Sequence, residues 1–341
     1  VPVSLLEGER LDRAAAWVRF GFPLPQGALF DPGRMRLVAA GTETPAQFTP
    51  TVFWPDDSLK WVLVDAAAPS RPEAQRDLAV EFGNAIRRAA PRPLLRLQDE
   101  PERLLITTGP LQVALDKHAF NVFADVRHDA DGNGRFDESE QVLAASPTGV
   151  TLVDEAGKVF TMAGQPPESV TVEMVGPERA VVRVRGAYAA ADGARYMRYL
   201  VRLSFYAGSA RVDLALTQIN DALQTEFTDI TALTLPLQPA AGVQQAEVLV
   251  DGQGTAPVAG VPLRLFQRDD TQGLLSSAGR ETAVGRAPGL VRCRGARAPF
   301  SAVLQDFWQR WPKGIAVDGE ALTFELLPRQ PDAGYGKDLP Y

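Results

Sequence analysis

Long runs in which apolar and polar residues alternate constrain the fold of this chain more than any other feature. An alternation with a period of two places successive side chains on opposite faces of a β-strand. Such runs are frequent from about residue 94 onward, so we expect a large antiparallel β-sandwich over residues 93–328. The clearest runs are LLITTG, LQVALD, SVTVEMV, RAVVRVRGAY, YMRYLVRLSFYAG and ARVDLALTQI.

The first part of the chain contains shorter apolar stretches that glycine and proline interrupt. Runs of strand length at this spacing predict a small all-β barrel or sandwich over residues 1–92, and its last part, RRAAPRPLL, is typical of a linker. The whole chain is therefore expected to be all-β with few short helices. The best helix signal lies over residues 302–311, where apolar residues recur at helical spacing before Pro312.

One segment, DADGNGRFDESE at residues 129–140, has the ligand spacing of a calcium-binding loop of the EF-hand type. Such loops place oxygen ligands at positions 1, 3, 5, 7, 9 and 12 and a glycine at position 6. Oxygen ligands alone suit a hard cation, and their number favours Ca²⁺ over Mg²⁺. The expected ligands are Asp129, Asp131, Asn133, the backbone carbonyl of Arg135, Asp137 acting through water, and Glu140.

The sequences that flank this loop distinguish it from an EF-hand. FNVFADVRH before it and QVLAASPTGVTLV after it both lack the 3.6-residue apolar period of EF-hand helices. We therefore expect a loop between strands that binds a structural calcium ion; the alternative is a polar hairpin loop built from Asx turns. Calcium loops of modest affinity suit compartments with millimolar calcium, so the expected localisation is extracellular or periplasmic.

Composition argues against several other functions. The chain has 35 Lys and Arg against 42 Asp and Glu, a net charge of −7 without a basic block, so nucleic acid is not an expected partner. No membrane span is expected, because no apolar run reaches about 18 residues. The single cysteine, Cys293, excludes an internal disulfide and a thiolate-rich metal site, and a buried thiol is expected there.

Two phrases in the first part combine turn residues with aromatic residues: GFPLPQGAL at residues 21–29 and WPDDSLKWVLVD at residues 54–65. Trp54 and Trp61 are expected to fill a core, with stacking on a sugar as the alternative. These phrases resemble the exo-acting rhamnogalacturonan lyases, the family that includes the YetA-like proteins. Two later segments are similar to the same family, YLVRLSFYAGSARVDLALTQIND at residues 199–221 and DFWQRWPKGIAVDGEALTFELLP at residues 306–328.

The resemblance implies a small N-terminal RIFT-like barrel followed by the large β-sandwich. It also implies an acidic polysaccharide or oligosaccharide as the partner, pectic rhamnogalacturonan as the substrate class, and cleavage by a polysaccharide lyase. The resembled lyases continue into an α/α toroid of paired helices. Residues 329–341 are therefore expected to be a linker toward such a domain in the same or a partner chain, with part of the active site outside this chain.

Cleavage by β-elimination next to a uronic acid needs a group that neutralises the uronate carboxylate. Arg183 and Arg185 share a face of one expected strand, and Arg198 and Arg202 share a face of the next. If the two faces coincide, the four side chains form a strip that binds carboxylates. The alternative is a solvated polar face paired with Glu173 and Glu178.

The reaction also needs a base that removes the proton alpha to the carboxyl group. His118 precedes the calcium loop and is a candidate base, with a hydrogen-bonded loop histidine as the alternative. Two rival functions stay open: a non-catalytic carbohydrate-binding module, and a structural surface or assembly protein. Uronate binding without turnover would identify the first, and self-association without glycan binding the second.

Overall fold

The computed structural model describes residues 1–3, 13–70, 78–90, 94–223, 228–250, 254–258 and 261–329. In these residues strands dominate, and the helical elements are three short 3-10 turns. The expected all-β class with few short helices is confirmed. None of the helical elements in the described part of the chain is long and apolar enough to cross a membrane. Residues 330–341 of the expected linker lie outside the described residues.

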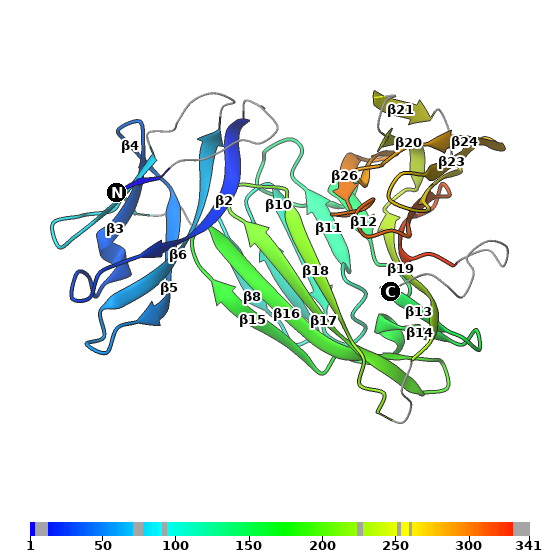
Figure 1. The fold of residues 1–341 in the computed structure, drawn as a ribbon, viewed down its shortest axis with the longest axis horizontal. Coiled ribbons are helices and arrows are strands. Elements are labelled where there is room, and N and C mark those ends of the chain that lie inside the picture. Colours follow the sequence, from blue (N-terminus) through cyan, green and yellow to red (C-terminus); the bar gives the residue numbers. More distant parts are fainter. Residues whose placement is uncertain are drawn as a thin grey trace. The chain divides into compact units, whose positions relative to one another are not determined.

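The chain divides into two compact units, whose strands Figure 1 traces in chain order. The first unit contains residues 1–96, 172–181 and 204–212. The second contains residues 97–171, 182–203 and 213–341. Parts of four long strands therefore belong to the first unit: residues 172–175 of β15 (Ser169–Val175), and one end each of β16 (Arg179–Ala189), β17 (Arg195–Tyr206) and β18 (Val212–Ile219), whose longer parts belong to the second.

Two antiparallel sheets enclose the apolar core of the first unit. One sheet has the order β2-β6-β5, with β2 at Arg13–Pro23, β6 at Leu59–Ser70 and β5 at Ala46–Phe53. The other has the order β1-β7-β3-β4. Its strands are β1 (Pro2–Val3), β7 (Leu78–Phe82), β3 (Met35–Ala39), which the 3-10 turn η1 (Pro32–Arg34) precedes, and β4 (Thr42–Thr44).

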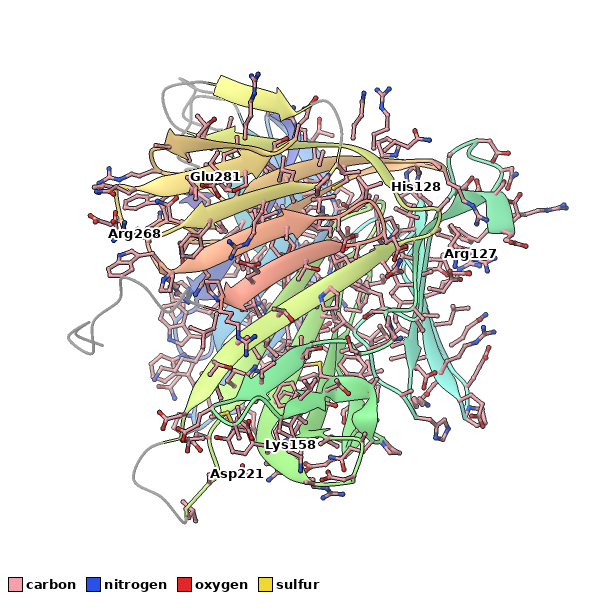
Figure 2. All side chains as sticks on the ribbon, turned by 90° about the vertical axis from the view of Figure 1, so that its right-hand side faces the viewer. Arg127, His128, Lys158, Asp221, Arg268 and Glu281 are labelled. Carbon is pink, nitrogen blue, oxygen red and sulfur yellow. The ribbon has the colours of Figure 1, made fainter. Side chains whose placement is uncertain are left out.

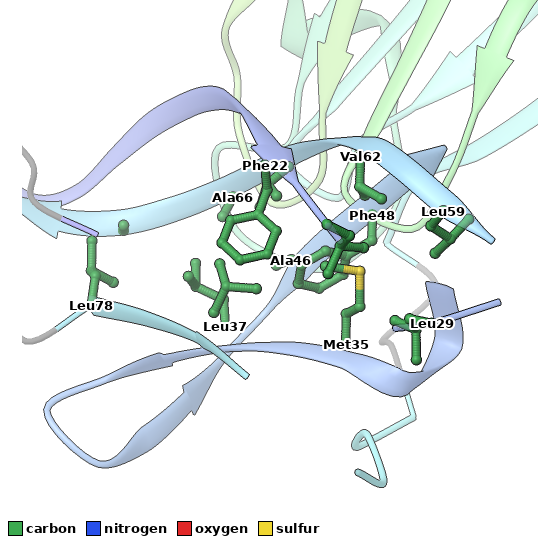
Figure 3. Close-up of a cluster of buried hydrophobic side chains, with 14 residues drawn as sticks. Phe22, Leu29, Met35, Leu37, Ala46, Phe48, Leu59, Val62, Ala66 and Leu78 are labelled. Carbon is green, nitrogen blue, oxygen red and sulfur yellow. The ribbon is translucent and has the colours of Figure 1, made fainter. Parts of the chain in front are cut away.

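The core of this unit follows from the alternation in its strands. Val62 and Val64 of β6 point inward and are fully buried. Trp61 and Leu63, which alternate with them along the strand, point to the other face of the sheet. Figure 3 shows Val62 and Phe22 above Leu37, which comes from the facing sheet. Burying an aliphatic or aromatic side chain of this size stabilises a fold by about 1.5–3 kcal/mol.

The second unit is built mainly from one closed circuit of paired strands that includes β15 to β18. Its hairpins are antiparallel, as the alternating sequence predicts. The two 3-10 turns in this region are η2 (Glu138–Glu140) and η3 (Met162–Gly164). The other strands of the circuit are β8 (Arg96–Asp99), β9 (Arg103–Thr107), β10 (Leu111–Asp116), β11 (Asp125–His128), β12 (Gln141–Ala144), β13 (Thr151–Asp154), β14 (Val159–Thr161), β19 (Ile230–Pro239), β22 (Leu263–Gln267), β23 (Gly273–Ser277), β24 (Arg280–Val284), β27 (Lys313–Val317) and β28 (Leu322–Leu327).

A separate four-stranded sheet has the order β21-β20-β25-β26, with β21 at Gly254–Val258, β20 at Val243–Val250, β25 at Leu290–Gly295 and β26 at Pro299–Val303. Cys293 lies on the buried side of β25 and is a free thiol, so the expected buried cysteine is confirmed. Burial raises the pKa of this thiol to about 12, which keeps it protonated and unreactive at neutral pH.

The helix expected over residues 302–311 is wrong. Val303 ends β26, where it pairs with Leu290 of β25. The residues after it form turns, with an α-helical hydrogen bond from the Arg310 N–H to the Asp306 carbonyl at 2.9 Å. Phe307 is fully buried while Val303 is exposed, so the apolar spacing of Val303, Leu304, Phe307 and Trp308 does not define one buried helical face. Strand pairing with β25 determines the conformation instead.

Candidate functional site

The candidate calcium loop connects two antiparallel strands of the second unit, β11 and β12 (Figure 1). Val126 pairs with Leu143, and the chain between the strands contains residues 129–140. Arg127 and His128 lie at the base of the loop, at the end of β11 (Figure 2). Arg127 donates through Nη1 to the Phe136 carbonyl at 3.0 Å, which ties the middle of the loop to its base. The expected placement between strands is thus observed.

The first half of the loop folds around the carboxylate of Asp129. Its Oδ1 accepts a hydrogen bond from the Asn133 N–H at 3.0 Å, and its Oδ2 accepts one from the Gly134 N–H at 2.9 Å. Gly134 has a φ of 74°, a left-handed conformation that favours glycine. The glycine at position 6 therefore allows the turn that brings two N–H groups to the first carboxylate.

The second half of the loop ends in the 3-10 turn η2 (Glu138–Glu140). Asp137 caps this turn, because its Oδ1 accepts a hydrogen bond from the Ser139 N–H at 2.8 Å. Hydrogen bonds from the Ser139 hydroxyl and N–H lower the pKa of Asp137 and keep it ionised at neutral pH. The Glu140 carboxylate accepts hydrogen bonds from the N–H groups of Ala130 at 2.9 Å and Asp137 at 3.3 Å. Glu140 is thereby turned back toward the start of the loop.

Three of the six expected ligands converge. The carboxylates of Asp129, Asp131 and Glu140 each place an oxygen within 4.8 Å of the other two. Two oxygens that bind one calcium ion at about 2.3–2.6 Å cannot lie more than about 5 Å apart, so this group fits the geometry of the ion. Three ionised carboxylates this close repel one another unless a cation balances their charge.

Two of the other three expected ligands, Asn133 and Asp137, form hydrogen bonds within the loop. The Oδ1 of Asn133 accepts a hydrogen bond from the Arg135 N–H at 2.7 Å, and its Nδ2 donates to Asp131 at 2.7 Å. Asp137 caps η2, although it also lines the adjacent pocket.

A pocket of about 210 Å³ lies beside the carboxylates. Arg297, on the turn between β25 and β26, contributes to its wall and donates through Nη1 to the Glu138 carbonyl at 2.7 Å and to Gln141 Oε1 at 3.2 Å. Sequence reasoning missed Arg297, because nothing in the local pattern indicates which distant turn meets the loop. The pocket is lined by His128, Ala130, Asp131, Asp137, Ser139, Glu140, Arg297 and Ala298.

The arginines expected to bind carboxylates lie on β16 and β17. Arg183 and Arg185 are half-buried and alternate with the buried Val182 and Val184, so they share one face of β16. Arg198 and Arg202 on β17 are also half-buried. Whether the four side chains form one strip stays a prediction.

Arg198 has a carboxylate partner that differs from the expected ones. It forms a salt bridge with Glu168, whose N–H donates to the Arg185 carbonyl at 2.7 Å. Glu178 does not face solvent as the alternative expects: it is buried in the first unit. A carboxylate ligand that binds Arg198 would therefore compete with Glu168.

His118, the candidate base, lies after β10 and is exposed. Its Nε2 is 2.9 Å from Glu102 Oε2, and its N–H donates to Asp116 Oδ1 at 2.6 Å. It is not among the residues that line the pocket at the calcium loop. This arrangement matches the hydrogen-bonded loop histidine that was the alternative interpretation.

The two aromatic phrases lie in the first unit. Trp54 is half-buried and donates through Nε1 to the Leu24 carbonyl at 3.0 Å. Trp61 is 41% exposed, so its expected place in the core is wrong. The reason is its register on β6, where it alternates with the buried Val62 and lies on the opposite face of the sheet.

The chain matches known proteins over both of its expected domains. Residues 1–81 match the PcRGLX-like N-terminal RIFT barrel domain, and residues 95–239 match the PcRGLX-like protein central beta sandwich domain. The chain is also similar to the uncharacterized protein YetA of Bacillus subtilis (strain 168), at 24% identity over 216 residues. That match covers 61% of this chain and spans 24% of the length of YetA.

These matches confirm the resemblance, the RIFT barrel and the β-sandwich that the sequence led us to expect. The two domains follow one another in the expected order and together cover about two thirds of the chain. The chain therefore belongs to the PcRGLX-like family.

Proposed function

We propose that this chain is the front part of a polysaccharide lyase that acts on pectic rhamnogalacturonan. The observation that supports it is the combination of a RIFT barrel with a central β-sandwich from a family related to rhamnogalacturonan lyase. An acidic polysaccharide or oligosaccharide would be its ligand, in an extracellular or periplasmic compartment. An α/α toroid domain, in the same or a partner chain, would complete the active site.

In this proposal the arginines of β16 and β17 bind the uronate carboxylate. Removal of the proton alpha to that carboxylate leaves charge on it, and guanidinium groups stabilise the developing charge. The electron pair then forms a carbon–carbon double bond as the glycosidic oxygen leaves, and an acid protonates that oxygen. Arg183, Arg185 and Arg202 would hold the substrate, and Arg198 would exchange Glu168 for the substrate carboxylate.

We further propose that residues 129–140 bind a structural calcium ion. Asp129, Asp131 and Glu140 would hold it, joined by Asn133, the Arg135 carbonyl and Asp137 through water. The ion would cancel the repulsion among the three carboxylates. Because Arg297 contacts Glu138 in the same loop, ordering of the loop would also stabilise the turn between β25 and β26.

A second candidate function is a non-catalytic carbohydrate-binding module. His118 favours it, because this candidate base is exposed, is paired with Glu102 and is not among the residues that line the pocket at the calcium loop. On this reading the chain positions the glycan and the base belongs to another domain. A structural surface or assembly role has no comparable observation in its favour.

Incubation of the chain with rhamnogalacturonan tests both candidates. Ultraviolet absorbance of the new double bond, conjugated with the carboxylate, would support a lyase that is active in this chain. Saturable binding without that absorbance would support the binding module. Neither binding nor product from a folded, calcium-loaded protein would contradict both.

A further inference from the structure

The two aromatic phrases, residues 21–29 and 54–61, interlock in the first unit. The Leu24 N–H donates to the Lys60 carbonyl at 2.9 Å, and the Gly27 N–H donates to Ser58 Oγ at 2.9 Å. The Trp54 indole N–H closes the same arrangement on the Leu24 carbonyl at 3.0 Å. Ser58 is fully buried, so its hydroxyl group is shielded from water. We call this pair of segments the interlocked motif; its backbone is held in place before any partner binds.

Exposed aromatic side chains gather at this motif. Phe30 is 58% exposed, Phe53 is 53% exposed and Trp61 is 41% exposed. Phe30 and Phe53 are direct neighbours of the two segments, and Trp61 ends the second. Among the described residues, the other phenylalanine, tyrosine and tryptophan side chains are buried or half-buried. Aromatic side chains are enriched at contact surfaces, which makes these three side chains candidates for contact with a partner.

Trp61 lies against its neighbouring strand rather than projecting from it. Its register places it opposite Pro23 of β2 and Val52 of β5, which are both exposed. Ring atoms Cε3 and Cζ3 lie 3.4 Å from the point where a Cβ on Gly21 would stand. The missing side chain of Gly21 therefore gives the indole room to lie over β2. A ring held this way presents a flat surface, whereas an anchor for a protein partner must reach into a pocket.

The charges at the motif complement a ligand that donates hydrogen bonds and carries no negative charge. Hydrogen bonding to Ser58 lowers the pKa of Asp56, so it is ionised at neutral pH. Asp57 has a φ of 63°, and its carboxylate has no partner among the described residues. The ammonium group of Lys60 lies 4.2 Å from the centre of the Trp54 ring. Carboxylates accept hydrogen bonds from hydroxyl groups and repel another carboxylate placed directly against them, which favours a neutral sugar residue at this position.

From these observations we infer that the interlocked motif is a contact site for a neutral sugar residue of a glycan, which stacks its apolar face on Trp61. Aromatic rings bury apolar C–H groups, and Asp57, in the turn before β6, would accept hydrogen bonds from hydroxyl groups of the same glycan. The class of ligand rests on the proposed function, since rhamnogalacturonan carries neutral rhamnose beside its uronates. The motif belongs to the first unit, whereas the arginines of β16 and β17 that would recognise the uronates belong to the second.

Calorimetric titration of the whole chain with rhamnogalacturonan oligosaccharides tests this inference. Trp61→Ala is expected to weaken binding about tenfold or more. Trp61→Phe keeps an aromatic ring and is expected to weaken binding less than Trp61→Ala does. Asp57→Asn should weaken it by about two- to fivefold. Val303→Ala is the matched control, because it removes an apolar side chain that is 61% exposed in the second unit; it should leave binding unchanged.

The outcomes separate this inference from the proposed function. Wild-type binding that Trp61→Ala does not change would overturn the inference and leave the proposed function in place. An absence of wild-type binding to any rhamnogalacturonan oligosaccharide would overturn both. If the wild-type chain sediments in a concentration-dependent way and Trp61→Ala abolishes this behaviour, a second copy of the chain occupies this surface. That result would also overturn the inference. Thermal unfolding of each variant checks that it is folded.

Discussion

The Oε1 of Glu140 accepts a hydrogen bond from the Ala130 N–H at 2.9 Å, across ten positions of the chain. The last carboxylate of the loop is thereby held over its first turn, near Asp129 and Asp131. The loop's own backbone holds the carboxylates together without a helix on either side. This relationship explains how a ligand spacing typical of EF-hands can be used between two strands.

Calcium is expected to raise the thermal stability of the chain. An ion that binds only the folded state contributes about 2.7 kcal/mol at a hundred times its Kd. For a unit of this size that corresponds to a Tm increase of roughly 5–10 °C. Asp129→Ala or Glu140→Ala should abolish the increase, measured by calorimetry with calcium or with EDTA.

Glu138→Ala is the matched control for these two variants. Glu138 carries the same charge in the same loop, but it is highly exposed and lies outside the carboxylate cluster. It should retain most of the calcium effect. A Tm that is the same in calcium and in EDTA for the wild-type chain would disprove the calcium assignment.

Gly176 is expected to resist substitution because of Gln47. The Oε1 of the buried Gln47 accepts hydrogen bonds from the N–H groups of Glu178 at 3.2 Å and Arg179 at 3.0 Å. A Cβ added to Gly176 would stand 2.2 Å from that oxygen. Gly176→Ala should therefore displace the amide and lower the free energy of unfolding by about 2–4 kcal/mol. Urea denaturation measures the loss.

A double-mutant cycle separates this contact from a backbone effect. In the Gln47→Ala background the oxygen is absent, so adding Gly176→Ala should cost less than about 1 kcal/mol. An equal cost in both backgrounds would mean that the backbone at Gly176, rather than Gln47, excludes a side chain.

Lowering the pH should increase the stability of the first unit, because Glu178 becomes protonated. Burial raises the pKa of this carboxyl group above 4.5, although the Coulomb attraction of Arg88 opposes the shift. A raised folded-state pKa means that the contribution of Glu178 to stability is fully present below pH 4.5 and is lost as the pH rises through the higher folded-state value. The free energy of unfolding of Glu178→Gln should fall less over this window than that of the wild type. Parallel pH profiles for both proteins would refute the burial argument.

The arginines of β16 and β17 are expected to recognise uronates. Arg183→Ala and Arg198→Ala should each weaken the binding of a uronate oligosaccharide about tenfold, because a charge-assisted hydrogen bond is lost, and should leave neutral sugars unaffected. Glu168→Gln removes the competitor of Arg198 and should not weaken uronate binding. Arg310→Ala, which removes an exposed arginine, is the control. Equal losses of affinity for uronates and for neutral sugars would refute the prediction that these arginines form a carboxylate-binding strip.

The sequence predicts most of the strands and the position of the candidate metal centre. Alternation identifies strands such as β16 and β17 because each buries one face, and the spacing from Asp129 to Glu140 predicts a loop in which three of the expected ligands do converge. The prediction of a helix over residues 302–311 is wrong because a local apolar spacing carries no information about the strand pairing between Val303 and Leu290.

Contacts between distant segments cannot be predicted from a local sequence pattern, for the same physical reason. Arg297 meets Glu138 through the arrangement of two hairpins, which no local pattern encodes. Trp61 is exposed because of its register on β6 and because Gly21 leaves room beside it. A large aromatic residue predicts burial on average, but register decides which face of the sheet it occupies.

Calorimetric titration of the calcium-loaded chain with rhamnogalacturonan oligosaccharides tests the central claim most directly, because both the lyase and the binding-module functions require recognition of this glycan. The account predicts saturable binding that is weaker for Trp61→Ala and for Arg198→Ala. A folded protein that shows no binding heat with any of these oligosaccharides would contradict the account.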